Sequence, residues 1–543
     1  MSASDPIPTP RQRLEREWWR GATIYQIYPR SFADSNGDGI GDLPGITAHL
    51  DYVASLGVTG VWLSPFFTSP MKDFGYDVAD YCDVDPIFGT LADFDALVTR
   101  GRALGLKIII DQVYSHTSDA HAWFTESRSS RDNAKADWFV WADAKPDGGP
   151  PNNWQSVFGG PAWTWDARRQ QYYMHNFLAS QPQLNVHNPA VQDALLGVAR
   201  FWLERGADGF RVDAINFSMH DPELRDNPPA PPSNNAVRTR SFDFQQHIYN
   251  QSHPDIPLFL ERLRALTDEF GGFTVAEVGG ANAEAEMKAF TAGDHRLNSA
   301  YGFNFLYADT LTPALVRDAI ERWPDEPGMG WPSWAFENHD APRAISRWAA
   351  PEHADAFARM KMLLLLCLRG NVFLYYGEEL GLTQVDIGFD DLKDPEAIAN
   401  WPLTLGRDGA RTPMPWCNRS PGLGFSAARP WLPLGTDHAP RAVAAQQDDA
   451  GSLLRLTQRL VAMRNASDAL LLGDMRVIET GEALLVFERT APGERMLCVF
   501  NIGDRPIDWR PAEPSRWRLV QSVGAVGDGT IGPFSAYVAE ALF

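Results

Sequence analysis

The stretch GFRVDAINF, residues 209–217, carries two charged side chains in a segment that otherwise has the apolar character of a buried β-strand. Side chains alternate between the two faces of a strand, so Arg211 and Asp213 are expected to project from the same face as neighbours. An arginine beside a carboxylate lowers the pKa of that carboxylate and keeps it ionised. The pair is therefore either a structural ion pair or a nucleophile that is held in its charged form.

Two further apolar segments also end in acidic residues. Glu277 lies at the end of FTVAEV, and His339 and Asp340 end SWAFENHD. If these segments and the Asp213 segment are strands of one parallel sheet, their carboxyl ends bring the three acids together. Closely spaced acids push their pKa values apart, so that one stays protonated as a general acid while another remains an ionised nucleophile. This is the equipment of glycoside hydrolysis.

The elements that would position these acids alternate along the chain in the order of βα units. Helical segments separate eight candidate strands, and one of these segments, GITAHLDYVASLG, has its apolar residues on one face. Another begins with Asn188 as a helix cap, followed by Pro189. The pattern predicts an α/β fold, a (β/α)8 TIM barrel with its active site at the carboxyl ends of the strands. The candidate strands begin at Thr23, Val58, Lys107, Gly209, Phe273, Asn298, Ser333 and Asn371.

The alternation is interrupted after the third strand and changes near the C-terminus. Residues 117–187 are rich in Trp, Gly, Asn and Pro and are too many for a loop, so we expect an inserted subdomain over the barrel mouth. Residues 1–116 and 188–467 would form the two parts of the barrel. Residues 468–543 contain alternating short strands typical of an antiparallel β-sandwich. A segment rich in Pro and Asn follows the fourth strand and is expected to form an irregular loop over the same mouth.

Composition limits the partners and the compartment. The net charge of the 543 residues is -21, which argues against nucleic acid as a partner, because binding phosphates requires a basic surface. The four cysteines are far apart and form no CxxC pair, so neither a disulfide framework nor a zinc site is expected. The N-terminal residues contain no apolar signal segment, and the longest apolar run, MLLLLCL, is too short to span a bilayer. We expect a soluble, cytoplasmic protein that has no membrane partner.

Four motifs occur in the order DQVYSH (Asp111 to His116), GFRVDAIN, AEV (around Glu277) and ENHD. They resemble the four conserved regions of the α-amylase family of glycoside hydrolases. GVTGVWLSPF, GNVFLYYGEELG and ARTPMPW extend the resemblance over nearly the whole chain, which is most similar to the bacterial α-glucosidases of the oligo-1,6-glucosidase and maltase type. The resemblance implies that Asp213 is the nucleophile, Glu277 the general acid and base, and Asp340 the carboxylate that stabilises the distorted sugar. It also implies that His116, Arg211 and His339 bind the same glucose unit.

The same resemblance assigns further sugar contacts. Asp73 and Tyr76, in MKDFGYDV after the second strand, would contact the terminal glucose, and Asp73 would pair with Arg411 to close the pocket behind a non-reducing end. Such a closed pocket implies exo attack. Phe158 and Phe177 would wall the pocket by analogy. The alternatives are a plain turn at Asp73 and Tyr76, a core histidine at His116, and core aromatics at Phe158 and Phe177.

The segment DSNGDGIGD is a candidate metal loop because oxygen-bearing side chains recur at Asp34, Asn36, Asp38 and Asp42. An EF-hand is excluded because the twelfth position is Gly45 instead of a bidentate glutamate. Similar loops of the α-glucosidases hold one structural calcium or magnesium ion, with the carbonyl of Ile40 as a further ligand. The alternative is a turn rich in Asp, Asn and Gly that binds no metal.

These observations predict a retaining, exo-acting α-glucosidase that hydrolyses short α-1,4-glucosides by double displacement and transfers glucose to small alcohol or sugar acceptors. Ala214 follows Asp213, so strand alternation predicts that its side chain points away from the nucleophile, at the rim of the first sugar site. In the resembling enzymes a valine at this position accompanies α-1,6 cleavage, so Ala214 favours α-1,4 links. The familiar QPDLN is QPQLN here. The alternatives are a sucrose-active or trehalose-forming glucosyltransferase, and a non-catalytic relative such as the amino-acid-transporter heavy chains. That last class lacks parts of the carboxylate set and carries a membrane anchor, whereas this chain has all three acids.

Overall fold

A computed structural model describes residues 17–232, 238–280, 282–323, 330–403, 406–418, 421–527 and 529–542. Eight parallel strands close into a barrel in the order β1-β13-β12-β11-β10-β9-β5-β2. Each strand overlaps one of the eight segments expected from the sequence, so the predicted (β/α)8 barrel is confirmed. The strands are β1 (Thr23–Ile27), β2 (Gly60–Leu63), β5 (Lys107–Val113), β9 (Gly209–Asp213), β10 (Phe273–Val278), β11 (Ser299–Gly302), β12 (Trp331–Ala335) and β13 (Asn371–Tyr375).

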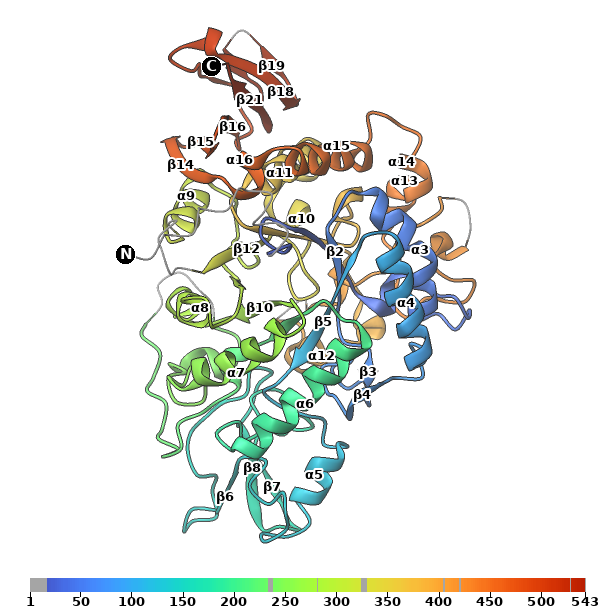
Figure 1. Ribbon diagram of the computed structural model, residues 1–543. Helices are drawn as coiled ribbons and strands as arrows, with labels where there is room; N and C mark the ends of the chain where they lie inside the picture. The colour runs from blue at the N-terminus through green and yellow to red at the C-terminus, as the bar shows by residue number, and fades with distance from the viewer. Residues whose placement is uncertain are drawn as a thin grey trace, which may run out of the picture.

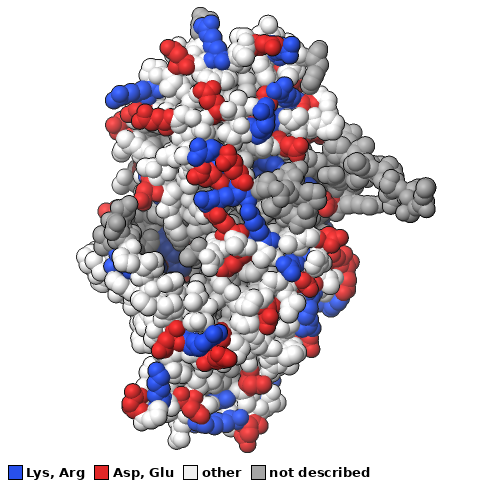
Figure 2. Space-filling view, turned by 90° about the vertical axis from the view of Figure 1, so that its left-hand side faces the viewer, with Lys and Arg blue, Asp and Glu red and all other residues white. Residues whose placement is uncertain are grey.

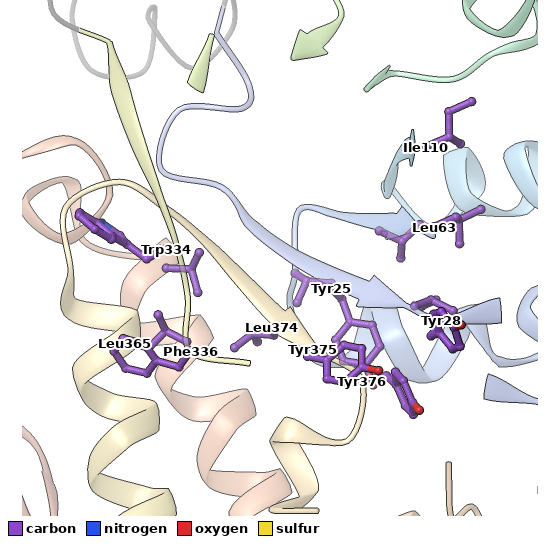
Figure 3. Close-up of a cluster of buried hydrophobic side chains, with 14 of the residues drawn as sticks. Tyr25, Tyr28, Leu63, Ile110, Trp334, Phe336, Leu365, Leu374, Tyr375 and Tyr376 are labelled. Carbon is purple, nitrogen blue, oxygen red and sulfur yellow. The ribbon is translucent and has the colours of Figure 1, made fainter. Parts of the chain in front are cut away.

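Alternation along the strands separates two apolar layers. Ile24, Trp62 and Ile109 belong to one buried cluster with Phe273 and Phe373. Their neighbours along the same strands belong to the larger cluster formed with the surrounding helices. Because adjacent residues of a strand face opposite sides, the first cluster fills the barrel and the second covers it. Figure 3 shows part of the outer cluster, where Tyr25 of β1 lies beside Leu374 of β13, its partner in the parallel register.

The helices begin where the sequence provides caps. Asn188 accepts a hydrogen bond from the Ala190 N–H at the start of α6, as expected, and Gly206 ends that helix with a φ of 107°. The segment expected to be the first strand ends early, because Pro29 begins the short helix α2 (Pro29–Phe32). The other barrel helices are α3 (Leu43–Ser55), α4 (Leu91–Ala103), α6 (Pro189–Arg205), α7 (Ile256–Asp268), α8 (Ala283–Thr291), α9 (Pro313–Glu321), α10 (Ala344–Trp348) and α11 (Ala354–Cys367).

A small unit lies between β5 and α6. It contains α5 (Ala122–Ser127) and a three-stranded sheet of β6 (Trp141–Ala142), β8 (Gln171–Met174) and β7 (Trp163–Asp166), in that order. Buried aromatic side chains, among them Trp154 and Trp163, give this unit a core of its own. In Figure 1 it lies at the opposite end of the molecule from the C-terminal strands. A two-stranded ribbon of β3 (Phe67–Thr68) and β4 (Asp80–Val84) follows β2.

The C-terminal part begins with two helices, α15 (Leu453–Asn465) and α16 (Asp468–Leu472), so the strands begin at Asp474 and not at 468. Ser467 caps α16 by accepting the N–H of Leu470, which explains the delay. Two antiparallel sheets follow, in the orders β14-β15-β16-β21-β18 and β17-β20-β19. Their strands are β14 (Asp474–Thr480), β15 (Leu484–Ala491), β16 (Glu494–Asn501), β17 (Ile507–Asp508), β18 (Trp517–Val523), β19 (Val526–Gly527), β20 (Thr530–Ile531) and β21 (Ser535–Ala541).

The helices and one face of the surface have two features of note. Within the described ranges, none of the helices combines the length and the apolar character that a membrane crossing needs. On the face drawn in Figure 2, Lys and Arg side chains alternate with Asp and Glu side chains and do not gather into one basic area.

Candidate active site

A cavity of about 260 Å³ opens at the carboxyl ends of the barrel strands. Its walls come from the loops after β2, β5, β9, β11, β12 and β13, from the inserted unit and from β10 itself. All three predicted catalytic acids line it. So do five of the predicted sugar contacts, namely Asp73, Tyr76, His116, Phe158 and Phe177. The other three, Arg211, His339 and Arg411, are buried behind this lining.

Arg211 lies under the acids and contacts three carboxylates. Its Nη1 is 2.7 Å from Asp111 Oδ1 and 2.5 Å from Asp213 Oδ1, and its Nη2 forms an ion pair with Glu277. The contact with Asp213 confirms that these two residues share one face of β9. The guanidinium is fully buried and lies 4.9 Å from the centre of the Trp62 ring. Arg211 therefore forms the ion pair that the sequence left open, but it does not keep the pKa of Asp213 low, because burial outweighs its charge and raises that pKa to about 7.

Sharing one guanidinium limits the separation of Asp213 and Glu277. Because both carboxylates contact the same guanidinium, they lie close together. Retaining glycosidases place their two carboxyl groups about 5 Å apart, whereas inverting enzymes need about 6.5–9.5 Å to admit a water molecule. The close approach of the two acids favours the retaining class. Glu277 is oriented further by the Tyr301 hydroxyl, which donates to Oε1 at 3.1 Å, and by the Ala214 N–H, which donates to Oε2 at 3.3 Å.

Burial tunes these acids toward neutral pH. It raises the pKa of Asp213 to about 7 against the opposing charge of Arg211, and it raises the pKa of Glu277 to about 7 against the same opposition. The charge of Asp213 also raises the pKa of Glu277, and the charge of Glu277 raises the pKa of Asp111. The loss of a proton by one acid therefore makes the loss of a proton by its neighbour harder. Near neutral pH such a pair can keep one proton, as a mechanism with one acid and one nucleophile requires.

Asp340 is held ionised by a different set of neighbours. Burial opposes its charge, but His339, Arg407 and Arg411 outweigh burial and hold the pKa of Asp340 well below its usual range. Arg411 Nη2 is 2.8 Å from Asp340 Oδ1, and Arg411 Nε donates to the His339 carbonyl at 2.7 Å. Asp340 is thus a fixed negative charge in the cavity wall.

The expected pairing of Asp73 with Arg411 is wrong, because Asp73 pairs with Arg407. Arg407 Nη2 is 2.9 Å from Asp73 Oδ1 and 2.8 Å from Asp394 Oδ1. Arg407 lines the cavity, whereas Arg411 is buried behind Asp340. The two arginines lie four residues apart around one short helical turn, Asp408–Ala410, so spacing alone could not decide which of them reaches Asp73.

The predicted histidines lie in a hydrogen-bonded layer beside the acids. His339 Nε2 is 2.6 Å from the Tyr76 hydroxyl and 3.2 Å from Asp340 Oδ2, and the two rings of Tyr76 and His339 stack at 5.4 Å. His116 Nε2 is 3.2 Å from the Gln181 amide, which also donates to Asp73 at 3.0 Å. Burial lowers the pKa of His116 to about 4 and that of His339 to about 3, so both rings are neutral at pH 7.

Gln183 of QPQLN stands where the resembling enzymes have an aspartate, and its contacts explain the amide. The Gln183 amide donates to the Phe217 carbonyl at 2.7 Å and accepts from Asn176 at 2.9 Å, and its side chain is buried. A glutamine both donates and accepts, whereas an ionised carboxylate only accepts. The amide therefore joins the inserted unit to the loop after β9 without burying a charge.

Several cavity residues were missed by sequence reasoning. Arg240 and Phe242 come from the loop after β9, Phe303 and Tyr307 from the loop after β11, and Glu396 from α12 (Pro395–Asn400). Arg240 Nη1 is 3.1 Å from Glu396 Oε1, which joins two loops across the mouth. The sequence contains no periodic signal for such contacts, because they depend on the paths of irregular loops.

Ala214 has a conformation that differs from the expected one. Its φ and ψ are 36° and 45°, so the chain leaves strand geometry directly after Asp213 and strand alternation does not apply to Ala214. Its position at the rim of the first sugar site nevertheless agrees with the structure, since it lines the cavity beside Asp213. The left-handed turn brings its N–H toward Glu277, as described above.

The candidate metal loop is built on successive turns. Asp34 accepts the N–H groups of Gly37 and Gly39, and Asp38 accepts the N–H of Ile40. Asp42 is buried and caps α3 by accepting the N–H of Gly45 at 2.6 Å. The side chains offer oxygen donors only, which suits calcium or magnesium. The carboxylates of Asp34, Asp38 and Asp42 are not gathered within 4.8 Å of one another.

Comparison with known proteins decides the family. The family model described as "Alpha amylase, catalytic domain" matches residues 26–473. The chain belongs to the α-amylase family. It is 54% identical over 498 residues to a probable alpha-glucosidase of Rhizobium meliloti (strain 1021), with 90% of each chain covered. It is 35% identical over 524 residues to an oligo-1,6-glucosidase of Parageobacillus thermoglucosidasius, covering 91% of this chain and 92% of the relative.

Solved structures agree with this assignment. The alpha-glucosyl transfer enzyme XgtA superposes with a TM-score of 0.93 at 48% identity, covering 97% of this chain and 100% of XgtA. A variant of isomaltulose synthase from Erwinia rhapontici NX5, in complex with its natural substrate sucrose, superposes with a TM-score of 0.88 at 28% identity, covering 99% and 100% of the two chains. The chain is thus a glycoside hydrolase of the α-amylase family.

Proposed function

We propose that this protein is a retaining, exo-acting α-glucosidase that hydrolyses short α-1,4-glucosides and transfers glucose to small alcohol or sugar acceptors. The observation that carries the proposal is the sharing of one buried guanidinium by Asp213 and Glu277 at the base of the cavity. The names of two relatives add weight, since one is a probable alpha-glucosidase and the other an alpha-glucosyl transfer enzyme.

The chemistry follows from the charge states of the acids. Asp213 attacks the anomeric carbon while Glu277 donates its proton to the leaving oxygen, which breaks the glycosidic bond and forms a glucosyl ester on Asp213. Glu277, now ionised, removes a proton from water or an acceptor hydroxyl. That oxygen then displaces Asp213 and restores both starting states. Asp340 stays ionised throughout and stabilises the positive charge that develops on the sugar ring.

Exo attack follows from the closed side of the cavity. The ion pair of Asp73 and Arg407 stands in the wall, and the Arg407 guanidinium lies 5.2 Å from the centre of the Phe158 ring. A carboxylate and a guanidinium side by side offer acceptors and donors to neighbouring hydroxyls of a terminal glucose. We expect this wall to block a longer chain beyond that sugar, as exo attack requires.

Product analysis tests the activity. Incubation with maltose, isomaltose, sucrose and trehalose, followed by chromatography, should give glucose from maltose fastest, with glucosides appearing when a small alcohol is abundant. Isomerisation of sucrose as the dominant reaction would instead favour a sucrose-active glucosyltransferase. A structural neighbour, the isomaltulose synthase variant, has sucrose as its natural substrate.

The residue after the nucleophile should set linkage preference. Ala214→Val adds two methyl groups at the rim of the first sugar site and should shift the ratio of kcat/KM for maltose over isomaltose toward isomaltose by about 10-fold, since shape differences discriminate by about 1–3 kcal/mol. A β-branched residue is strained at a φ of 36°, so thermal unfolding and the Ala214→Ser variant serve as controls. An unchanged ratio in a folded Val variant would show that Ala214 does not set the linkage preference.

The pH dependence of kcat/KM should be bell-shaped with its maximum near neutral pH. The acid limb arises because Asp213 must lose its proton, and the alkaline limb because Glu277 must keep its own, and burial raises both pKa values to about 7. Histidine makes no contribution above neutral pH, since His116 and His339 are neutral there. Glu277→Gln should abolish the alkaline limb on an activated aryl glucoside. Survival of that limb in the variant would contradict the assignment.

The loop from Asp34 to Asp42 is proposed to bind one calcium or magnesium ion, with Asp34, Asn36, Asp38, Asp42 and the Ile40 carbonyl as ligands. The ion would be structural, because the loop lies between α2 and α3, whereas Asp213 ends β9, Glu277 lies in β10 and Asp340 follows β12. Chelation should lower the melting temperature, and activity should fall only as the structure loosens. Elemental analysis and melting curves with added calcium check this. Absence of a divalent ion together with no thermal shift would contradict it.

A further inference from the structure

Three histidines and an aspartate from different loops meet outside the active site. His187 precedes α6, His220 follows the short helical turn after β9, and His253 and Asp255 precede α7. The ring centres of His187 and His253 are 4.7 Å apart, and those of His187 and His220 are 5.3 Å apart. None of the four lines the active-site cavity. His187 and His220 line a separate cavity of about 360 Å³.

The ligand atoms of His187, His253 and Asp255 all lie within 4.8 Å of one another. In the part of the chain that the structure describes, no other group of three His, Cys, Asp or Glu residues meets this condition. Ligand atoms around a tetrahedral zinc ion with bonds of about 2.0–2.1 Å lie about 3.3 Å apart. To bind an ion, the three side chains must therefore move closer together, and a metal bond to His253 Nδ1 would replace the hydrogen bond that this atom accepts from the Asp255 N–H at 3.2 Å.

The protonation of His187 suits a metal ligand. Its Nε2 lies 2.7 Å from the backbone carbonyl of His220, and a carbonyl only accepts, so Nε2 carries the proton and Nδ1 keeps a lone pair. A hydrogen bond from the second ring nitrogen to a carbonyl is the support that metal-binding histidines usually have.

His220 supplies a second, independent observation. Its side chain is 6% exposed, and its Nδ1 is buried without a hydrogen-bond partner among the described residues. An unpaired buried nitrogen costs free energy, so a group that the protein alone does not provide should satisfy it. The unpaired Nδ1 can accept a hydrogen bond from a metal-bound water.

The other charged group beside the cluster is already paired. Asp221 forms an ion pair with Arg225, with Nε 2.8 Å from Oδ2. The cluster thus offers two imidazoles and one carboxylate, which is a ligand set that zinc and related divalent ions accept and that calcium and magnesium do not favour.

We infer that His187, His253 and Asp255 bind a divalent transition-metal ion such as Zn²⁺, with a water ligand that hydrogen-bonds to His220. His187 lies where the chain leaves the inserted unit, and His253 and Asp255 lie at the end of the segment between β9 and α7. The ion joins these two places directly, and its water ligand joins them to His220 at the start of that segment. That segment carries Arg240 and Phe242 to the mouth of the active-site cavity. The site is thus a clamp on a loop that forms part of the acceptor side.

Titration of the full-length protein with Co²⁺ tests the site. Excess calcium and magnesium are present throughout, so that the oxygen-rich loop near Asp34 is filled. One equivalent of cobalt should give the visible absorption of a site of low coordination number, and Zn²⁺ should displace it. His253→Asn and Asp255→Asn should each weaken cobalt binding by at least about 100-fold, more than the loss of an outer-shell partner.

His295→Asn is the matched control, because His295 is 60% exposed and belongs to a different cluster. It should bind cobalt as the parent does. Basal hydrolysis of metal-free variants should equal that of the metal-free parent, which establishes that they are folded. Asp255 has an exposed side chain, so its variant remains informative if His253→Asn fails to fold. No visible band in the parent, or equal binding by the folded Asp255→Asn variant, would overturn the inference.

Discussion

Asp213→Asn lowers kcat on maltose by at least about 10⁴-fold, as expected for the loss of a covalent nucleophile. The physical reason is that the amide of asparagine cannot form the glucosyl ester. The amide oxygen can still accept from Arg211 Nη1, which lies 2.5 Å from Asp213 Oδ1 in the parent. Binding of maltose, measured by calorimetry, should therefore change little while turnover is lost.

The control for Asp213→Asn is its melting temperature, which shows whether the variant is folded. The melting temperature should stay near that of the parent, because the asparagine is isosteric and removes a charge that burial disfavours. Asp111→Asn is the matched comparison, because Asp111 also contacts Arg211 at 2.7 Å but does not line the cavity. Retention of more than about one hundredth of the parent kcat by Asp213→Asn would show that another group attacks the sugar.

Glu277→Gln lowers kcat on maltose by about 10³–10⁴-fold, the upper part of the usual contribution of a general acid. Through its one carbonyl oxygen, glutamine can keep either the hydrogen bond from the Tyr301 hydroxyl or that from the Ala214 N–H, but it has no acidic proton to deliver. On an aryl glucoside with a very good leaving group the first step needs no acid. A burst of released phenol followed by a slow steady rate is therefore expected.

Two substrates separate this role from a structural one. If Glu277 only supported Arg211, both substrates would lose rate equally, because the cavity would be distorted for both. The expected result is a loss on maltose at least about 100-fold larger than the loss in the burst phase on the aryl glucoside. Stopped-flow absorbance measures the burst. Equal losses on the two substrates would contradict the assignment of Glu277.

The barrel could be predicted because its strands and helices leave periodic patterns. Eight apolar segments with helices between them predict a closed barrel of parallel strands. Side chains alternate along β9 with a period of two, which places Arg211 and Asp213 on the same face. The carboxyl ends of parallel strands lie at the same end of a barrel. Glu277 could therefore be placed in the same site as Asp213 from the sequence alone.

The loops could not be predicted to the same depth. Arg407 and Arg411 have the same residue type and lie on one short turn, so only the three-dimensional path shows that Arg407 reaches Asp73. Ala214 was assigned by strand alternation, yet the chain turns left-handed directly after Asp213. Arg240 and Glu396 meet across the cavity mouth from segments 156 residues apart. A hydrophobic pattern carries no information on such pairs.

The anomeric form of the first product tests the central claim, which is double displacement through Asp213 and Glu277. Proton NMR of the parent enzyme acting on maltose, recorded before mutarotation proceeds, follows the anomeric signals of the glucose released from the non-reducing end. The short spacing that Arg211 imposes on the two carboxylates predicts α-glucose first, with the β-anomer growing later by mutarotation. β-Glucose as the first product would mean direct displacement by water and would contradict the account.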